Sequence, residues 1–221
     1  MFSRFADRRE AGRALAAELA RYAGRRDLVV LALPRGGVPV AAEVARALGA
    51  PMDVFVVRKL GAPGYPELAL GAIASGGLRV IDPSMVRLLR VRPEEVERIA
   101  REEGVELERR ERAYRVGHAP LPVAGRTVIL VDDGLATGAS MMAAIAALRQ
   151  SGATAIVVAV PVAARQSLAR MRRAADDVVA VATPEPFFAV GLWYDDFTQT
   201  TDDEVRALLD SGAPALATTA R

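Results

Sequence analysis

The sequence contains no cysteine and is poor in several other residue types that often build functional sites. Without cysteine the chain can form no disulfide and can carry out no thiol chemistry, which is typical of a protein in a reducing cytoplasm. His118 is the only histidine, so the sequence offers no cluster of histidine and cysteine ligands for a metal ion. Lys59 is the only lysine among 29 basic residues, so its ammonium group stands out in an arginine-rich chain.

Long apolar runs and an excess of charge of one sign are also absent. No run approaches the length of about 18 apolar residues that suggests a membrane span, and the segment MFSRFADRRE has no apolar region of the kind found in signal peptides. The formal net charge is +2 with both signs interspersed, so nothing points to nucleic acid or a membrane as a partner. We therefore expect a cytoplasmic protein that binds small molecules.

The 221 residues, of which 52% are hydrophobic, are enough for one domain with a sizeable core. Short apolar runs rich in β-branched residues alternate with runs of helical periodicity, which predicts an α/β fold with a mostly parallel sheet. Predicted strands span 28–33, 52–57, 127–131, 155–160 and 178–181, and predicted helices span 6–22, 38–48, 138–150, 165–173 and 202–209.

The region between the second and third predicted strands breaks this alternation. Residues 60–68 contain two glycines and two prolines without periodicity and are predicted to form a loop. Residues 70–75 and 78–81 are predicted to form a hairpin across Gly76-Gly77. Residues 93–115 are highly charged with a thin apolar stripe, which predicts a long, partly exposed helix with ion pairs along its solvated face.

The stretch from Thr127 to Ser140, TVILVDDGLATGAS, carries the strongest functional signal. A buried strand ends in Asp132 and Asp133, at the edge where open α/β sheets bind ligands. The turn that follows is rich in small residues and opens a helix, so its main-chain N–H groups can bind an anion. The lysine of a P-loop and the spacing of the dinucleotide fingerprint are both missing. An acid pair with such a turn suits a ligand that carries a sugar diol and a phosphate.

This segment resembles the binding motif for 5-phosphoribosyl 1-diphosphate (PRPP) in the type I phosphoribosyltransferases, a strand followed by Asp-Asp-x-x-x-Thr-Gly. The resemblance implies an open, mostly parallel, doubly wound sheet with a small hood. It also implies a Mg²⁺-dependent enzyme that transfers the phosphoribosyl group from PRPP to a nitrogenous acceptor and releases diphosphate. A homodimer is expected.

The same resemblance assigns the PRPP contacts around the acid pair. Asp132 and Asp133 are expected to hold the ribose hydroxyls and to stabilise the positive charge that develops on the sugar. They would also lie near a Mg²⁺ ion that PRPP and water hold for the most part. The turn expected to bind the ribose and the 5-phosphate consists of Gly134, Leu135, Ala136, Thr137, Gly138, Ala139 and Ser140.

The diphosphate is expected at the ends of the first two strands. Residues 34–37, PRGG, follow the first strand, where two glycines allow the positive φ of an anion nest and Arg35 adds charge. Related enzymes often have a non-proline cis peptide in this loop, which is expected here at Pro34-Arg35 or Arg35-Gly36. A basic pair ends the second strand at the same edge. The predicted diphosphate ligands are Arg35, Gly36, Gly37, Arg58 and Lys59.

The acceptor is expected between a lid and a hood. Residues 60–68 resemble the mobile lid of the family, and RKLGAPG is similar to the adenine-specific enzymes. Glu67 in this lid is either a general acid or base or an ordinary surface carboxylate. Ala136 stands where the 6-oxopurine enzymes carry an acidic residue, which disfavours hypoxanthine and guanine as acceptors. 

Residues 184–201 resemble the hood, in which an aromatic side chain stacks on the acceptor. The predicted acceptor contacts are Phe188, Val190, Asp195 and Asp196, and the register between the two acids stays open.

The predicted organisation is a single domain over residues 1–221, with its core at 24–182 and a hood formed by 184–201 and the N-terminal helix. A charged helical insertion at 83–116 is longer than the small salvage enzymes need, so a standard purine or pyrimidine acceptor is not expected. The tail, 211–221, is expected to be disordered. Two other functions stay open: a non-catalytic regulator that senses PRPP or a nucleotide, and a hydrolase or phosphorolytic enzyme acting on a ribose phosphate.

Overall fold

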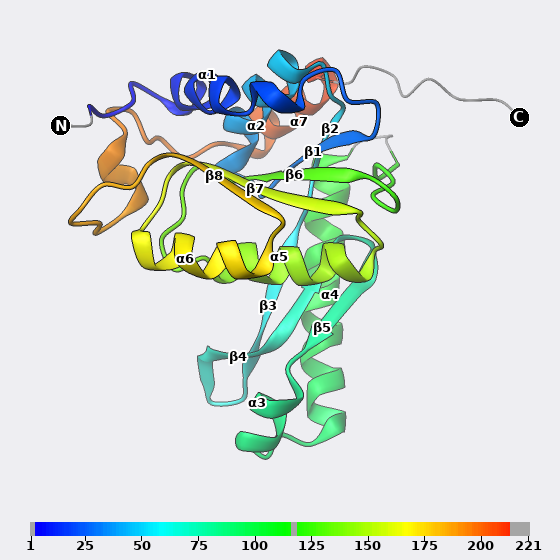
Figure 1. Ribbon diagram of the computed structural model, residues 1–221. Coiled ribbons are helices and arrows are strands. Elements are labelled where there is room, and N and C mark those ends of the chain that lie inside the picture. Colours follow the sequence, from blue (N-terminus) through cyan, green and yellow to red (C-terminus); the bar gives the residue numbers. More distant parts are fainter. Residues whose placement is uncertain (1–2, 116–118, 213–221) are drawn as a thin grey trace, which may run out of the picture.

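A computed structural model describes residues 3–115 and 119–212, and His118 lies outside them. Its larger sheet is open and parallel throughout, with strand order β2-β1-β6-β7-β8 (Figure 1). These strands are β1 (Leu28–Ala32), β2 (Met52–Val54), β6 (Thr127–Val131), β7 (Ala155–Val162) and β8 (Asp177–Ala182). The predicted α/β fold with a mostly parallel sheet is confirmed.

Helices cover both faces of this sheet, which makes it doubly wound (Figure 1). One face carries α1 (Arg8–Glu18), the 3₁₀ turn η1 (Ala20–Tyr22), α2 (Gly37–Leu48) and α7 (Asp202–Gly212). The other carries α5 (Ala139–Gln150) and α6 (Arg165–Ala174). Alternate residues of the central strands serve the two faces: Val30 packs toward α1 and α2, whereas Val29 packs toward α5. Both faces are therefore buried, which explains why β1 is apolar throughout and β6 is apolar after Thr127.

A second sheet extends away from the first and forms an arm of residues 57–114 (Figure 1). It is antiparallel, with strand order β3-β4-β5. The long helix α4 packs on one face of this sheet, and α5 of the core packs against the same three strands. The arm consists of β3 (Val57–Ala62), β4 (Tyr65–Ala74), η2 (Ser75–Gly77), β5 (Leu78–Ile81), α3 (Pro83–Leu88) and α4 (Pro93–Tyr114).

The loop predicted at residues 60–68 is wrong. Here β3 and β4 form a hairpin that turns at Pro63-Gly64, where Gly64 has φ +73°. Leu60 and Ala62 are buried in the same apolar cluster as Val96 and Ile99 of α4, so tertiary packing overrides the glycines and prolines. The predicted hairpin of β4 and β5 is confirmed, as is the charged helix, which continues unbroken through Gly104 as α4.

The start of the described chain meets the segment after β8 above the carboxyl edge of the parallel sheet. The main-chain N–H of Phe5 donates to the carbonyl of Trp193 at 3.0 Å, and the N–H of Asp195 donates back to the carbonyl of Phe5 at 2.8 Å. The segment 184–201, with η3 (Val190–Trp193), thereby joins the start of α1. We call these two segments the hood.

The last helix is longer than predicted. Thr201 and Glu204 form a reciprocal cap at its start, since the Thr201 N–H donates to Glu204 and the Glu204 N–H donates to the Thr201 hydroxyl. The helix α7 runs to Gly212, so residues 211 and 212 are helical rather than part of a disordered tail, and residues 213–221 lie outside the described chain. No helix within residues 3–115 or 119–212 has the length and apolarity needed to cross a membrane.

Candidate functional site

Asp132 and Asp133 follow β6 directly and stand at the centre of the carboxyl edge of the parallel sheet. Asp132 Oδ1 accepts a hydrogen bond from the main-chain N–H of Asp133 at 2.9 Å. Burial raises the pKa of Asp132 well above its ordinary value, and the neighbouring Asp133 charge raises it further. Burial raises the pKa of Asp133 as well, although the nearby Arg8 opposes this shift. The pair therefore stands where a carboxylate is costly unless a cation or a hydroxyl meets it.

Asp133 is held from three directions by other parts of the protein. Arg8 Nε donates to its Oδ2 at 2.9 Å, and the two side chains are only 10% and 15% exposed. The hydroxyl of Tyr194 donates to the main-chain carbonyl of Asp133 at 2.6 Å. On the third side lies Gly36, where an added Cβ would be 2.0 Å from Asp133 Oδ2. Within the described residues Asp132 has no ion-pair partner, so the two acids have different surroundings.

The turn between β1 and α2 touches the acid pair through its glycines. A Cβ on Gly37 would lie 2.8 Å from the Val131 carbonyl oxygen and 2.9 Å from Asp132 Cα. Gly36 has φ −59° and neither glycine has positive φ, so the expected positive-φ nest is wrong. These residues are glycines because the two loops approach so closely. The cis peptide expected in this turn is confirmed at Pro34-Arg35.

The turn after the acid pair presents its amides on one side. Its carbonyls face α6: Ser167 donates its hydroxyl to the Ala136 carbonyl, and Arg170 donates to the Thr137 carbonyl at 2.6 Å. Within the described residues no group accepts from the main-chain N–H of Ala136, Thr137 or Gly138. Gly138, with φ +74°, then starts α5, whose first N–H groups also lack helical acceptors. This arrangement can bind an anion such as a phosphate.

Leu135 is the exception within this turn, because it faces inward. Its side chain is buried, its N–H donates to the Val162 carbonyl at 2.9 Å, and its carbonyl accepts from Ala164 at 2.9 Å. Leu135 therefore fixes the turn to β7 and is placed to shape the site rather than to contact a ligand through its side chain.

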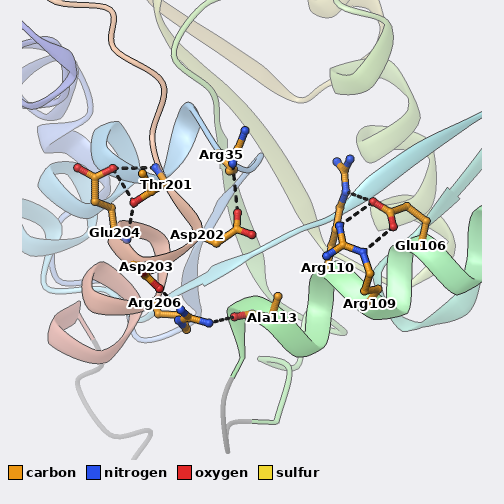
Figure 2. Close-up of polar contacts among 10 residues, drawn as sticks. All are labelled: Arg35, Glu106, Arg109, Arg110, Ala113, Thr201, Asp202, Asp203, Glu204 and Arg206. Atoms are coloured by element: carbon orange, nitrogen blue, oxygen red, sulfur yellow. Dashed lines mark hydrogen bonds and ion pairs between the residues drawn. The ribbon is translucent and has the colours of Figure 1, made fainter.

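Arg35 lies at the turn between β1 and α2, but its guanidinium reaches away toward α7. Its Nη1 is 3.3 Å from Asp202 Oδ1, as Figure 2 shows. Arg109 and Arg110 of α4 lie to one side of this contact and pair with Glu106 on their own helix (Figure 2). Several arginines thus gather where α4, α7 and this turn meet.

Arg58 and Lys59 do not end a strand of the parallel sheet, because β2 stops at Val54 and both residues lie inside β3. Successive side chains of a strand point to opposite faces. Arg58 therefore pairs with Glu103 of α4, with Nε 2.7 Å from Oε2. Lys59 lies on the other face, where it lines a cavity together with Ala139 and Ser140, at the end of the turn after the acid pair.

This cavity of about 650 Å³ lies between the arm and α5. Apart from Lys59, Ser140 and Asp82, its lining is apolar or glycine. Asp82 is occupied as the cap of α3, where it accepts from Ser84 at 2.8 Å. The structure thus separates the predicted basic pair, and of the two residues only Lys59 lies beside the turn after the acid pair.

The predicted acceptor residues are dispersed over the hood. Val190 packs against Gly134, the residue after the acid pair, since a Cβ on Gly134 would lie 2.4 Å from Val190 Cγ1. Phe188 is 79% exposed. Asp195 and Asp196 are exposed, and Asp196 accepts from the N–H and hydroxyl of Thr198. The side chain of Glu67 lies outside the described residues, so its role stays a prediction.

Sequence reasoning missed the hood residues that contact the acid pair. Arg8, held at the start of α1 by the Asp7 cap, bonds Asp133, and its guanidinium lies 3.9 Å from the ring centroid of Phe197. Tyr194, which was not among the predicted site residues, donates its hydroxyl to the Asp133 carbonyl. Arg8 gave no signal because it is one arginine in an arginine-rich chain.

The doubly wound parallel sheet, with an acid pair and an amide-lined turn at its carboxyl edge, agrees with the fold that the sequence resemblance implied. The family model for the phosphoribosyl transferase domain matches residues 5–196. The chain therefore belongs to the phosphoribosyl transferase domain family.

Similar proteins are known from bacteria. Relatives from two strains of Mycobacterium tuberculosis, each described only as a candidate phosphoribosyl transferase, are 50% identical over 206 residues. That match covers 93% of this chain but 46% of the relatives, so the chain spans about half their length. The crystal structure of TT1426 from Thermus thermophilus is 48% identical, with a TM-score of 0.87 over 95% of this chain and 99% of that one.

Proposed function

We propose that the protein transfers a phosphoribosyl group from PRPP to a nitrogenous acceptor and releases diphosphate. In this reaction the bond between C1 of the ribose and the diphosphate oxygen breaks, and a bond from C1 to the acceptor nitrogen forms. The observation that carries the proposal is the juxtaposition of the acid pair with a turn whose amides lack acceptors within the described chain. A sugar with hydroxyls beside a phosphate matches that juxtaposition.

The chain's own residues would divide the work along PRPP. The amides from Ala136 to Ser140 would bind the 5-phosphate, assisted by the start of α5. The acid pair would accept from the ribose hydroxyls and stabilise positive charge at C1 as diphosphate departs. Of the predicted diphosphate ligands, Gly36 and Gly37 lie against the acids, and Lys59 lines the cavity shared with Ser140.

Arg35 and Arg58 would contribute differently. In the structure each is paired with an acid, Asp202 and Glu103 respectively. Arg35 is one-third exposed and lies at the turn itself, so exchange of Asp202 for diphosphate requires only a side-chain movement. Arg58 faces α4, so it would act on the position of the arm.

Mg²⁺ is the cofactor proposed for this reaction. Within the described residues no group of three or more acidic, histidine or cysteine side chains could hold a metal ion. Mg²⁺ prefers oxygen ligands and commonly binds through one or two carboxylates together with substrate phosphates and water. Asp132 would be one such carboxylate ligand, and the positive charge of the ion would offset the negative charge of the diphosphate.

The acceptor would bind between the hood and the acid pair, near Val190 and Phe188. Calorimetric titration with PRPP and Mg²⁺ tests the donor, and diphosphate release across a panel of purines, pyrimidines and amines tests the acceptor. We expect micromolar to millimolar PRPP binding and acceptor-dependent diphosphate release. Binding without turnover of any acceptor would instead favour a regulator, release without an acceptor would favour a hydrolase, and no binding would contradict the proposal.

A further inference from the structure

Arg8 links three parts of the candidate site that belong to different segments of the chain. Its Nε bonds Asp133 at 2.9 Å, its Nη1 donates to the Thr198 carbonyl at 2.8 Å, and its guanidinium lies 3.9 Å from the ring centroid of Phe197. The side chain is only 10% exposed, so these contacts are largely removed from water. One cation therefore joins the acid pair to the main chain and an aromatic ring of the hood.

The contacts of Asp133 hold its Oδ2 and its main chain. Its Oδ2 accepts a hydrogen bond from Arg8 and lies against Gly36. Its main-chain N–H donates to Asp132, and its carbonyl accepts from the hydroxyl of Tyr194. Asp132, by contrast, forms no ion pair within the described residues, although the charge of Arg8 also acts on it from a greater distance. The two neighbouring acids are thus surrounded so differently that equal roles are not supported.

We propose that Arg8 is a positioning residue that neutralises Asp133 and fixes the hood to it, leaving Asp132 as the acid that meets the ribose. This inference rests on the proposed function and narrows it, since the sugar contact falls on one carboxylate rather than two. Electrostatics supplies the reason: an unpaired, mostly buried Asp133 would repel the phosphates of PRPP, whereas the ion pair carries no net charge.

Adjacent arginines on α1 provide a matched comparison. Arg9 is exposed and follows Arg8 on the same helix, so Arg8→Gln and Arg9→Gln remove the same charge one residue apart. Titration with PRPP and Mg²⁺, at a temperature where each variant is folded by circular dichroism, should show about tenfold or greater weakening for Arg8→Gln, which is a change of at least one decade in Kd. Arg9→Gln should bind as the wild type does. Equal affinities for the two variants would overturn the inference.

Removing the partner distinguishes charge neutralisation from a purely structural role. In Arg8→Gln with Asp133→Asn no unpaired charge remains, so PRPP should bind more tightly than to Arg8→Gln alone. If Arg8 had only a structural role, the double variant should bind PRPP more weakly than Arg8→Gln, because the second substitution would cause a further loss of affinity. Arg8→Lys, which keeps the charge, should bind PRPP more tightly than Arg8→Gln and serves if the glutamine variant fails to fold.

The single asparagine variants separate this inference from the proposed function. Asp132→Asn should lose PRPP binding by about a hundredfold or more, while Asp133→Asn should stay within about tenfold of the wild type. Equal, large losses would refute the division between the acids and leave the proposed function standing. Unchanged binding in both variants would contradict the proposed function itself.

Discussion

The carboxyl edge of the parallel sheet and the arm are stabilised by different kinds of contact. At the edge, the loops approach so closely that Gly36 and Gly37 leave no room for a Cβ atom, and the ion pair of Arg8 with Asp133 is mostly buried. In the arm, most ion pairs along α4 are partly or largely exposed, such as Arg98 with Glu102, and the buried pair of Glu111 with Arg115 lies at its C-terminal end. Exposed pairs contribute only about 0–1 kcal/mol each. The edge should therefore be sensitive to small changes that the arm tolerates.

The acid pair should show the largest effect. Replacing Asp132 and Asp133 together by asparagine keeps the size of both side chains but removes the charges that would stabilise the departing sugar. Diphosphate release should fall by at least about a hundredfold, as for other losses of electrostatic stabilisation. The measurement is release from PRPP with an acceptor found by the panel, and circular dichroism checks the fold. Activity retained in a folded double variant would contradict the assignment of the site.

Gly36→Ala tests the close approach at the edge. The new Cβ would lie 2.0 Å from Asp133 Oδ2, so the acid or the turn must move. We expect a loss of about 1–3 kcal/mol in the free energy of unfolding, typical of overpacking, together with weaker PRPP binding. Chemical denaturation and calorimetric titration measure the two effects. A variant as stable and as tightly binding as the wild type would show that the contact is easily relieved.

Asp132 should make stability depend on pH in an unusual direction. Because burial raises its pKa in the folded state above the unfolded value of about 3.9, the folded protein holds the proton more tightly. The contribution of Asp132 to stability is therefore greatest at low pH and is lost as the pH rises through the raised pKa.

Asp132→Asn should accordingly melt at a higher temperature than the wild type at pH 7, by about 2–4 °C for each kcal/mol gained. The difference should shrink toward pH 4. Asp133→Asn is the comparison, and its gain in melting temperature at pH 7 should be smaller, because the nearby Arg8 opposes the rise in the pKa of Asp133. Thermal scans at several pH values provide the measurement, and a lower melting point for Asp132→Asn at pH 7 would refute the argument.

Gly104→Ala should show the smallest effect and, in contrast to Gly36→Ala, a favourable one. Gly104 lies inside α4, and an added Cβ would meet only Ile73 Cδ1 at 3.6 Å, an ordinary contact. Alanine favours a helix interior over glycine by about 0.4–1 kcal/mol. Denaturation should show that gain with unchanged PRPP binding. Destabilisation comparable to that of Gly36→Ala would remove the distinction between edge and arm.

Sequence patterns predicted the parts of the fold whose stability comes from local periodicity. The apolar strand β6 and the highly charged helix α4, with its thin apolar stripe, were both predicted with nearly correct bounds, because each pattern repeats along its own element. The β3–β4 hairpin was missed because Gly61, Pro63, Gly64 and Pro66 favour a loop locally. Its pairing depends on burial by α4 and α5, which are distant in sequence.

Some of the predicted site residues do lie at the site, but the physical reason differs from the predicted one. Gly36 and Gly37 are close to the acid pair, but through a shortage of space rather than through positive φ. Arg58 and Lys59 were placed at one edge, whereas the alternation of β3 sends them to opposite faces. Arg8 could not be found, because its contact with Asp133 depends on where the hood places α1.

Because the hood joins Phe5 to Trp193 and Asp195, its assembly must follow the order in which the ribosome delivers the chain. The parallel sheet, with α1 packed on α2, can form as soon as β8 has emerged, whereas the bridge from Phe5 to Trp193 and Asp195 must wait for residues 184–201. A chain released too early can therefore contain every strand of the parallel sheet and still leave the acid pair open to solvent.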